Sequence, residues 1–80
     1  MRDEGILPGD LVIVHKQRTA RNGQTIVALV NQEATIKKYY RKDKGIELHP
    51  ANATLSPIVI TPSDEFVIEG VVIGVIRHCG

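Results

Sequence analysis

Lys37 could act as a chemical base if the fold covers it. It stands two positions after Thr35 in a run, residues 33–40, whose alternation predicts a β-strand with Thr35 and Lys37 on the same face. Covering a lysine on a strand removes water from its ammonium group and favours the neutral amine. A neutral amine can take the proton of a seryl hydroxyl in a Ser–Lys dyad. Most strand lysines stay solvated, so spacing alone makes a plain surface lysine the simpler interpretation.

Residues 37–44 also raise the possibility of nucleic-acid binding. They contain five basic residues around Tyr39 and Tyr40. Aromatic rings among cations on a β surface can stack bases and neutralise phosphates, as in small β-barrel modules. A strand that runs into a loop also collects solvated lysines and arginines without a partner, and a formal net charge of +1 gives only a weak electrostatic attraction. A nucleic-acid-binding β-barrel is therefore kept as an alternative.

The histidines and the cysteine form no recognisable metal motif. His15, His49 and His78 lack the pairing at roughly two to five residues that zinc ligands usually show, so no metal and no cofactor are expected. The single Cys79 excludes an internal disulfide and fits a reducing cytoplasm. No apolar run approaches the roughly 20 residues of a membrane span, and the first residues do not form a signal peptide. We expect a cytoplasmic protein without a membrane partner.

Composition favours strands as the elements that position these residues. Of the 80 residues, 19 are valine or isoleucine and five are threonine, and branched Cβ atoms suit strands better than helices. Turn residues separate strand-like runs at 11–14, 25–30, 33–40, 46–49, 58–60 and 65–77. The pattern predicts a single all-β domain over residues 1–80, with little or no helix.

Details of the pattern predict how these strands are arranged. Residues 11–14 are apolar on both faces, which favours a central strand. The dipeptide Asn22-Gly23 is typical of a type I′ hairpin turn, and Asn31-Gln32 marks the next reversal. Gly70 and Gly74 weaken the last strand, so a bulge or a close backbone approach is expected there.

An ordered series of segments carries a family resemblance. It consists of GILPGDLVIV at 5–14, RNGQ at 21–24, ATIKK at 34–38, HPAN at 49–52, SPIV at 56–59 and IEGVVIGVIR at 68–77. In order and spacing it resembles the C-terminal domain of the LexA repressors and of their relatives UmuD and the self-cleaving phage repressors. His15-Lys16 and the segment 21–24 are more similar to LexA than to UmuD. The resemblance implies a compact, highly twisted β domain of the LexA and signal-peptidase type.

The resemblance also implies a catalytic site. Members cut their own chain with a Ser–Lys dyad, and the Thr35-Ile36-Lys37 segment matches the one that holds their lysine, with Thr35 supporting it. Met1 matches the methionine that follows the nucleophilic serine, so the nucleophile would stand one residue before this sequence. Neither Ser56 nor Ser63 lies in the matching context. We therefore expect Lys37 to have nothing to activate and the chain alone to be proteolytically inert.

The partners implied by the resemblance are a second copy, a RecA filament and DNA. Family members are repressors of the SOS response to DNA damage that dimerise through the final strand. RecA stimulates their self-cleavage, and an N-terminal domain, absent from this sequence, binds DNA. A UmuD-like polymerase accessory fragment would differ only in its partners. The dimer residues expected here are Val71, Val72, Ile73, Val75, Ile76 and Arg77. A long apolar segment near the chain end would also leave an exposed edge for pairing, unless it is simply central in one sheet.

Overall fold

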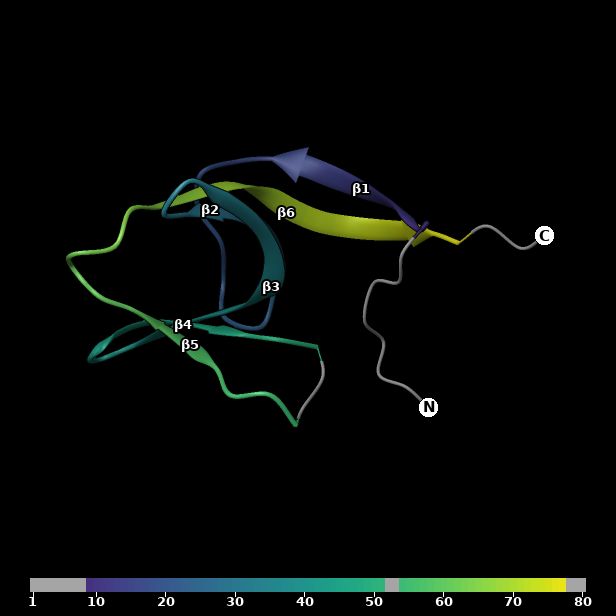
Figure 1. The fold of residues 1–80 in the computed structure, drawn as a ribbon. Coiled ribbons are helices and arrows are strands. Elements are labelled where there is room, and N and C mark those ends of the chain that lie inside the picture. Colours follow the sequence, from purple (N-terminus) through teal and green to yellow (C-terminus); the bar gives the residue numbers. More distant parts are fainter. Residues whose placement is uncertain (1–8, 52–53, 78–80) are drawn as a thin grey trace.

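The structure is a computed structural model that describes residues 9–51 and 54–77. Its elements are β1 (Leu11–Lys16), β2 (Thr25–Val30), β3 (Glu33–Lys42), β4 (Gly45–His49), β5 (Ile58–Ile60) and β6 (Phe66–Ile76) (Figure 1). They form one antiparallel sheet in the order β1-β6-β2-β3-β4-β5. No helix occurs in the described part of the chain. The predicted all-β class is confirmed.

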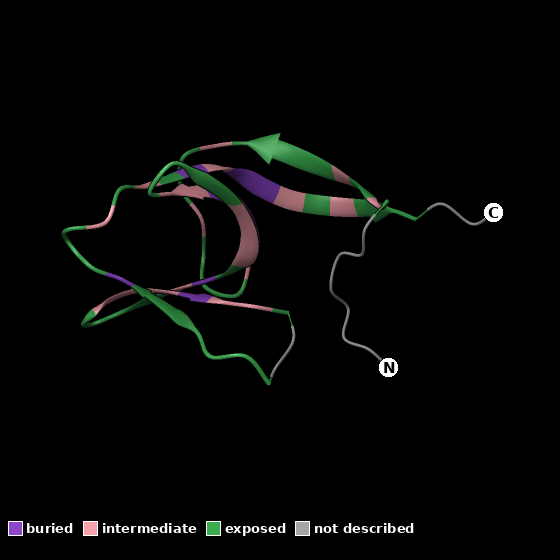
Figure 2. Cartoon of the chain, viewed as in Figure 1, coloured by how far each residue is buried: buried purple, intermediate pink, exposed green. Residues whose placement is uncertain are grey.

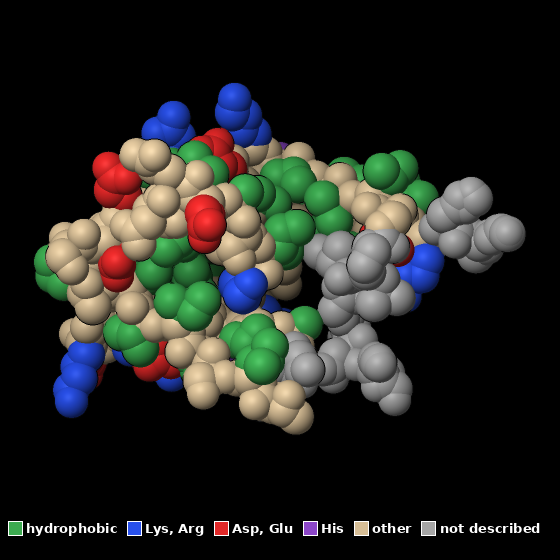
Figure 3. All heavy atoms as spheres, in the orientation of Figure 1, with side chains coloured by type: hydrophobic (Ala, Val, Ile, Leu, Met, Phe, Trp, Pro, Cys, Tyr) green, Lys and Arg blue, Asp and Glu red, His purple; other side chains and the backbone are tan. Residues whose placement is uncertain are grey.

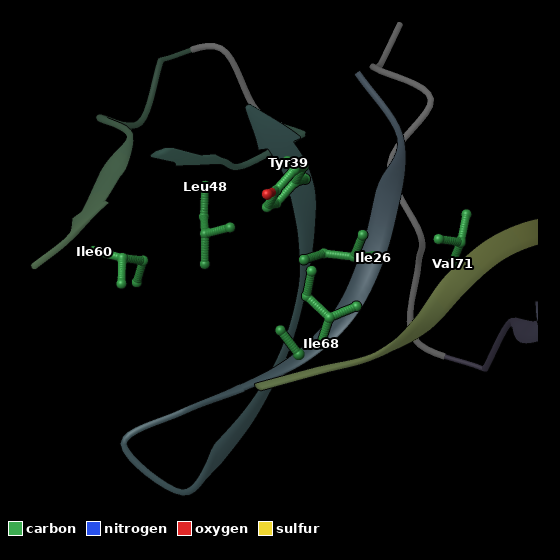
Figure 4. Close-up of a cluster of buried hydrophobic side chains, with 7 residues drawn as sticks. Ile26, Tyr39, Leu48, Ile60, Ile68 and Val71 are labelled. Atoms are coloured by element: carbon green, nitrogen blue, oxygen red, sulfur yellow. The ribbon is translucent and has the colours of Figure 1, made fainter. Parts of the chain in front are cut away.

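The sheet is strongly curled, and its core lies inside the curl. Figure 1 shows β3 bending sharply between β2 and β4, so that β4 and β5 come round opposite β6. The buried side chains gather from five strands and point toward one another (Figure 4). They are Ile26, Ala28, Tyr39, Leu48, Ile60, Ile68 and Val71. Curling is what allows a single sheet to enclose an apolar core on one of its own faces.

The prediction that residues 11–14 form a central strand is wrong. Within the described part of the chain β1 is an edge strand that pairs with β6 alone, and five of its six residues are exposed (Figure 2). Leu11 is 65% exposed and Ile13 45% exposed. An apolar run on both faces of a strand indicates covering on both sides, but the cover can be another chain rather than the strand's own sheet.

The predicted type I′ turn at Asn22-Gly23 is also wrong. β1 and β2 do not pair, and of these two turn residues only Gly23 has a positive φ, of 90°. With Gln24 N donating to Arg21 O at 3.1 Å, the geometry is that of a type II turn. The hairpin turn with two positive φ values is Asn31-Gln32, at 51° and 73°, which reverses the chain between β2 and β3 as predicted.

β6 is the longest strand and its two halves have different neighbours. Its first half pairs with β2 as far as Val71, and the stretch from Gly70 to Ile76 pairs with β1. Residues 72–76 therefore have a neighbouring strand on one side only within the described chain. The expected edge is a half-edge, since β6 lies inside the sheet over the rest of its length. The expected bulge is confirmed, because Ile73 is the extra residue between the pairs with Ile13 and Val14.

Candidate functional site

Lys37 and Thr35 are joined by a short hydrogen bond. Lys37 Nζ donates to Thr35 Oγ1 at 2.7 Å, and both side chains are half-buried. Both belong to β3 and share one face, because they are two residues apart. The register places Lys37 opposite Ile26 and Thr35 opposite Ala28, both 0% exposed. The pair therefore lies on the core face of the sheet.

Lys37 has apolar neighbours toward the core and, among the described residues, no strand partner on the β4 side. Ile26 lies across the ladder, and Tyr39, 6% exposed, is the next residue on the same face of β3. The β3–β4 ladder begins only at Lys38, paired with His49. Lys37 thus has a strand beside it on the β2 side but not on the β4 side of the described chain. A second segment could reach the amine from that side.

The two serines of the sequence do not complete a dyad in the described structure. Ser63 lies in the turn between β5 and β6, where its Oγ is 2.9 Å from Thr61 Oγ1. Ser56 is exposed just before β5. The hydrogen-bond partner of Lys37 Nζ among the described residues is Thr35. Met1, which the resemblance places after the nucleophile, lies outside the described residues.

The basic segment at 37–44 is divided between the two faces of the sheet. Tyr39 is part of the core, so its ring is unavailable for stacking on a base. Tyr40 faces the other side and lies against His49, with 4.6 Å between the ring centroids. Lys42 Nζ lies 5.7 Å from the centre of the Tyr40 ring, and His49 Nε2 is 2.9 Å from Glu47 Oε1. These contacts engage the aromatic groups within the protein.

The part of the chain that the structure describes contains neither a cluster of metal ligands nor a membrane-spanning helix. No three His, Cys, Asp or Glu side chains of residues 9–51 and 54–77 come together as metal ligands. The same residues contain no helix that is long and apolar enough to cross a membrane. His78 and Cys79 lie outside the described residues.

The residues expected at the dimer interface fall into three groups. Val71 is 4% exposed and belongs to the core. Ile73, Val75 and Ile76 are 64%, 42% and 53% exposed on the half-edge of β6, and Val72 is half-buried beside them. Together with exposed Leu11, Ile13 and Val14 of β1, they form what we call the apolar ribbon; Figure 3 shows hydrophobic side chains along this end of the molecule.

Arg77 has a contact that the sequence did not reveal. Its Nη2 lies 2.9 Å from Asp10 Oδ2, and its Nε donates to both carboxylate oxygens. The Asp10 side chain is only 4% exposed, so the pair is partly desolvated. It links the residue before β1 to the residue after β6 and closes the end of the apolar ribbon. The separation of 67 residues gave no local signal for it.

Comparison with known proteins gives these features a family. The family model described as Peptidase S24-like matches residues 1–73. The chain belongs to this family. Among curated relatives, it is 58% identical over 78 residues to a protein named LexA repressor from Syntrophotalea carbinolica. It is 52% identical over 77 residues to the LexA repressor of Bordetella avium, and 49% identical over 79 residues to that of Idiomarina loihiensis.

These relatives are longer proteins. The matches cover 96–98% of this chain but only 36–39% of the relatives. The likeness extends through the Thr35–Lys37 pair and into β6, so the resemblance drawn from the sequence motifs is confirmed.

Proposed function

We propose that this chain is the C-terminal self-cleavage and dimerisation part of a LexA-type repressor of the SOS response. The observation that carries the proposal is the half-buried Lys37–Thr35 pair, with 2.7 Å between Nζ and Oγ1, in a chain of the S24-like family. The relatives reported above bear the name LexA repressor, which supports this branch over a UmuD-like accessory fragment.

In the proposed mechanism Lys37 is the general base. Its neutral amine takes the proton of the serine hydroxyl, and the resulting alkoxide attacks the scissile carbonyl carbon to form a tetrahedral intermediate. The same lysine returns the proton to the amide nitrogen as the C–N bond breaks, which leaves an acyl-enzyme that a water molecule then hydrolyses. Thr35 fixes Nζ by accepting its hydrogen bond, which directs the remaining lone pair or proton toward the open side. The serine is the one that the resemblance places before Met1.

A chimeric repressor tests the lysine. The 78 matched residues of the Syntrophotalea carbinolica LexA repressor are replaced by those of this chain, and self-cleavage at alkaline pH is followed by gel electrophoresis. We expect the chimera to cut itself and Lys37→Ala to slow the cut by at least about 100-fold, since general base catalysis contributes about that much. Lys38→Ala is the matched control, because Lys38 is the next residue but faces the other way.

Two outcomes would refute the dyad. One is a Lys37→Ala chimera that cleaves itself as fast as the parent chimera. The other is self-cleavage of the isolated 80-residue chain, which on this proposal has no activated serine. Loss of cleavage in both Lys37→Ala and Lys38→Ala would also count against a specific role for Lys37, provided that both chimeras retain the circular dichroism of the parent.

Dimerisation through the apolar ribbon is the second part of the proposal. Among the residues that the structure describes, the half-edge of β6 at residues 72–76 has no strand partner on one side, and exposed aliphatic side chains lie on and beside it. Such an edge pairs readily with another strand, and homodimers use the same patch twice. We infer further that the full-length protein acts in the cytoplasm, binds DNA through an N-terminal domain and cleaves itself in response to RecA filaments.

A further inference from the structure

Ile26 stands directly across the β2–β3 ladder from Lys37 and is 0% exposed. Directly opposed side chains in an antiparallel pair have Cβ atoms about 4.5–5.5 Å apart, so these two adjoin on the core face. A lysine stem packs along apolar surface while its amine seeks a polar partner. Ile26 therefore lines one side of the Lys37 stem, while Thr35 holds Nζ at 2.7 Å.

Ile26 also has a buried neighbour on the side of β2 that faces away from Lys37. The residue opposite it on the other side of β2 is Val71 of β6, which is 4% exposed. Figure 4 shows Ile26 between the strand that carries Tyr39 and the strand that carries Val71. Val71, Ile26 and Lys37 thus form one row across three strands. Close packing of such a row leaves Ile26 little room to shift, so it is a rigid support for the stem.

We propose that Ile26 is a positioning residue for Lys37, whose side chain keeps Nζ in contact with Thr35 Oγ1. Its meaning for catalysis rests on the proposed function, in which Lys37 is the base of the dyad. Ile26→Val removes one methylene from beside the stem and opens a gap there. The gap lets the amine leave the threonine hydroxyl and become more accessible.

Competitive acylation of lysines measures this accessibility without requiring any peptidase activity. The 80-residue chain is treated with a limiting amount of the N-hydroxysuccinimide ester of acetic acid, and tandem mass spectrometry gives the initial rates of acetylation at Lys37 and at its exposed neighbour Lys38. Taking the ratio of the Lys37 rate to the Lys38 rate cancels differences in reagent concentration between samples. We expect Ile26→Val to raise this ratio about fivefold, the effect of losing one ordinary hydrogen bond.

A matched core variant separates positioning from general loosening. Ile60→Val removes the same methylene from a buried isoleucine, 8% exposed, on β5 at the far side of the core. We expect it to leave the ratio unchanged. An equal rise in both variants overturns the proposal. Ile26→Leu, which keeps the volume but moves the branch, should raise the ratio in the same direction, and an unchanged ratio in both folded Ile26 variants also overturns it.

A double-mutant cycle with Thr35→Val tests whether Ile26 acts through the hydrogen bond. Thr35→Val removes the acceptor and should itself raise the ratio. Because both changes release the same amine, adding Ile26→Val should then have no further effect, whereas independent effects would multiply and contradict the proposal. The dyad is judged separately by the chimera: self-cleavage without Lys37 would refute the proposed function and leave the acylation result intact.

Discussion

Asp64 connects two turns that are distant in sequence. Its carboxylate accepts hydrogen bonds from the backbone N–H of Thr61 at 2.9 Å and from Asn31 Nδ2 at 3.1 Å. The Thr61 hydroxyl donates a third, at 3.1 Å. The Thr61 backbone N–H above all, followed by the Asn31 amide, holds the pKa of Asp64 below its ordinary value of 3.8, because these donors stabilise the ionised form.

We expect Asp64→Asn to destabilise the chain in a pH-dependent way. Because the folded pKa is lowered, the ionised carboxylate stabilises the fold above pH 3.8, and this contribution is lost as the pH falls through the lowered value. The wild-type chain should have the larger free energy of unfolding at about pH 7 and lose that advantage in acid. Urea denaturation across this range measures the difference, with Asp43→Asn outside the cluster as control. A difference that does not change with pH would contradict the expectation.

At the scale of elements, the pairing of β1 with β6 depends on the absence of a side chain at Gly70. A Cβ at this position would meet Val14 Cγ1 and would lie 2.7 Å from the carbonyl oxygen of His15. The carbonyl belongs to the backbone and cannot turn aside. We therefore expect Gly70→Ala to lower the free energy of unfolding by about 1–3 kcal/mol, the usual cost of overpacking. Gly74→Ala meets only the flexible end of Ile13, at 3.3 Å, and should cost less. Urea midpoints of the two variants check this order; equal midpoints would contradict it.

The strands were predictable because their signals are local, whereas the backbone geometry of two turns was not. The runs at 25–30 and 58–60 coincide with β2 and β5, and the others differ by a few residues at their ends. Asn22-Gly23 has the usual hairpin composition but joins strands that do not pair. The positive φ of Gln32 is rare, and it occurs where Asn31 N donates to Glu65 O at 2.8 Å. That contact is set by the tertiary structure and leaves no trace in the local sequence.

At the scale of the whole molecule, the sequence could predict which residues of one strand share a face, but not which residues of other strands lie beside them at the site. Alternation placed Thr35 and Lys37 on one face, and the structure adds that this is the core face, because Ile26 and Ala28 lie opposite them. Register between strands is a long-range property, so Ile26 could not be chosen in advance from among many isoleucines. The family resemblance indicated a role for Lys37 but did not indicate that Ile26 lies beside it. The ion pair of Arg77 with Asp10 could not be predicted from the sequence for the same reason.

The apolar ribbon leads to a prediction about the assembly of the molecule. Two ends of the sheet expose aliphatic side chains: the ribbon on β1 and β6, and β5 with Val59, 53% exposed. Of these two ends, as far as the described residues go, the first has a long half-edge beside it, whereas β5 has only three residues. Ile73, 64% exposed at the bulge, would be present twice in a two-fold contact, so Ile73→Glu places two desolvated charges there.

We expect Ile73→Glu to raise the dimer Kd by at least about tenfold. Val59 is likewise an exposed aliphatic residue but lies on the opposite edge, so Val59→Glu should leave the Kd unchanged. Sedimentation velocity over a range of concentrations measures both. If Val59→Glu dissociates the dimer and Ile73→Glu does not, β5 is the interface instead. A wild-type chain that remains monomeric at high micromolar concentration would refute dimerisation through either edge. Because neither residue belongs to the core, circular dichroism of the two variants should match that of the parent, and any change in sedimentation then reports the contact between copies.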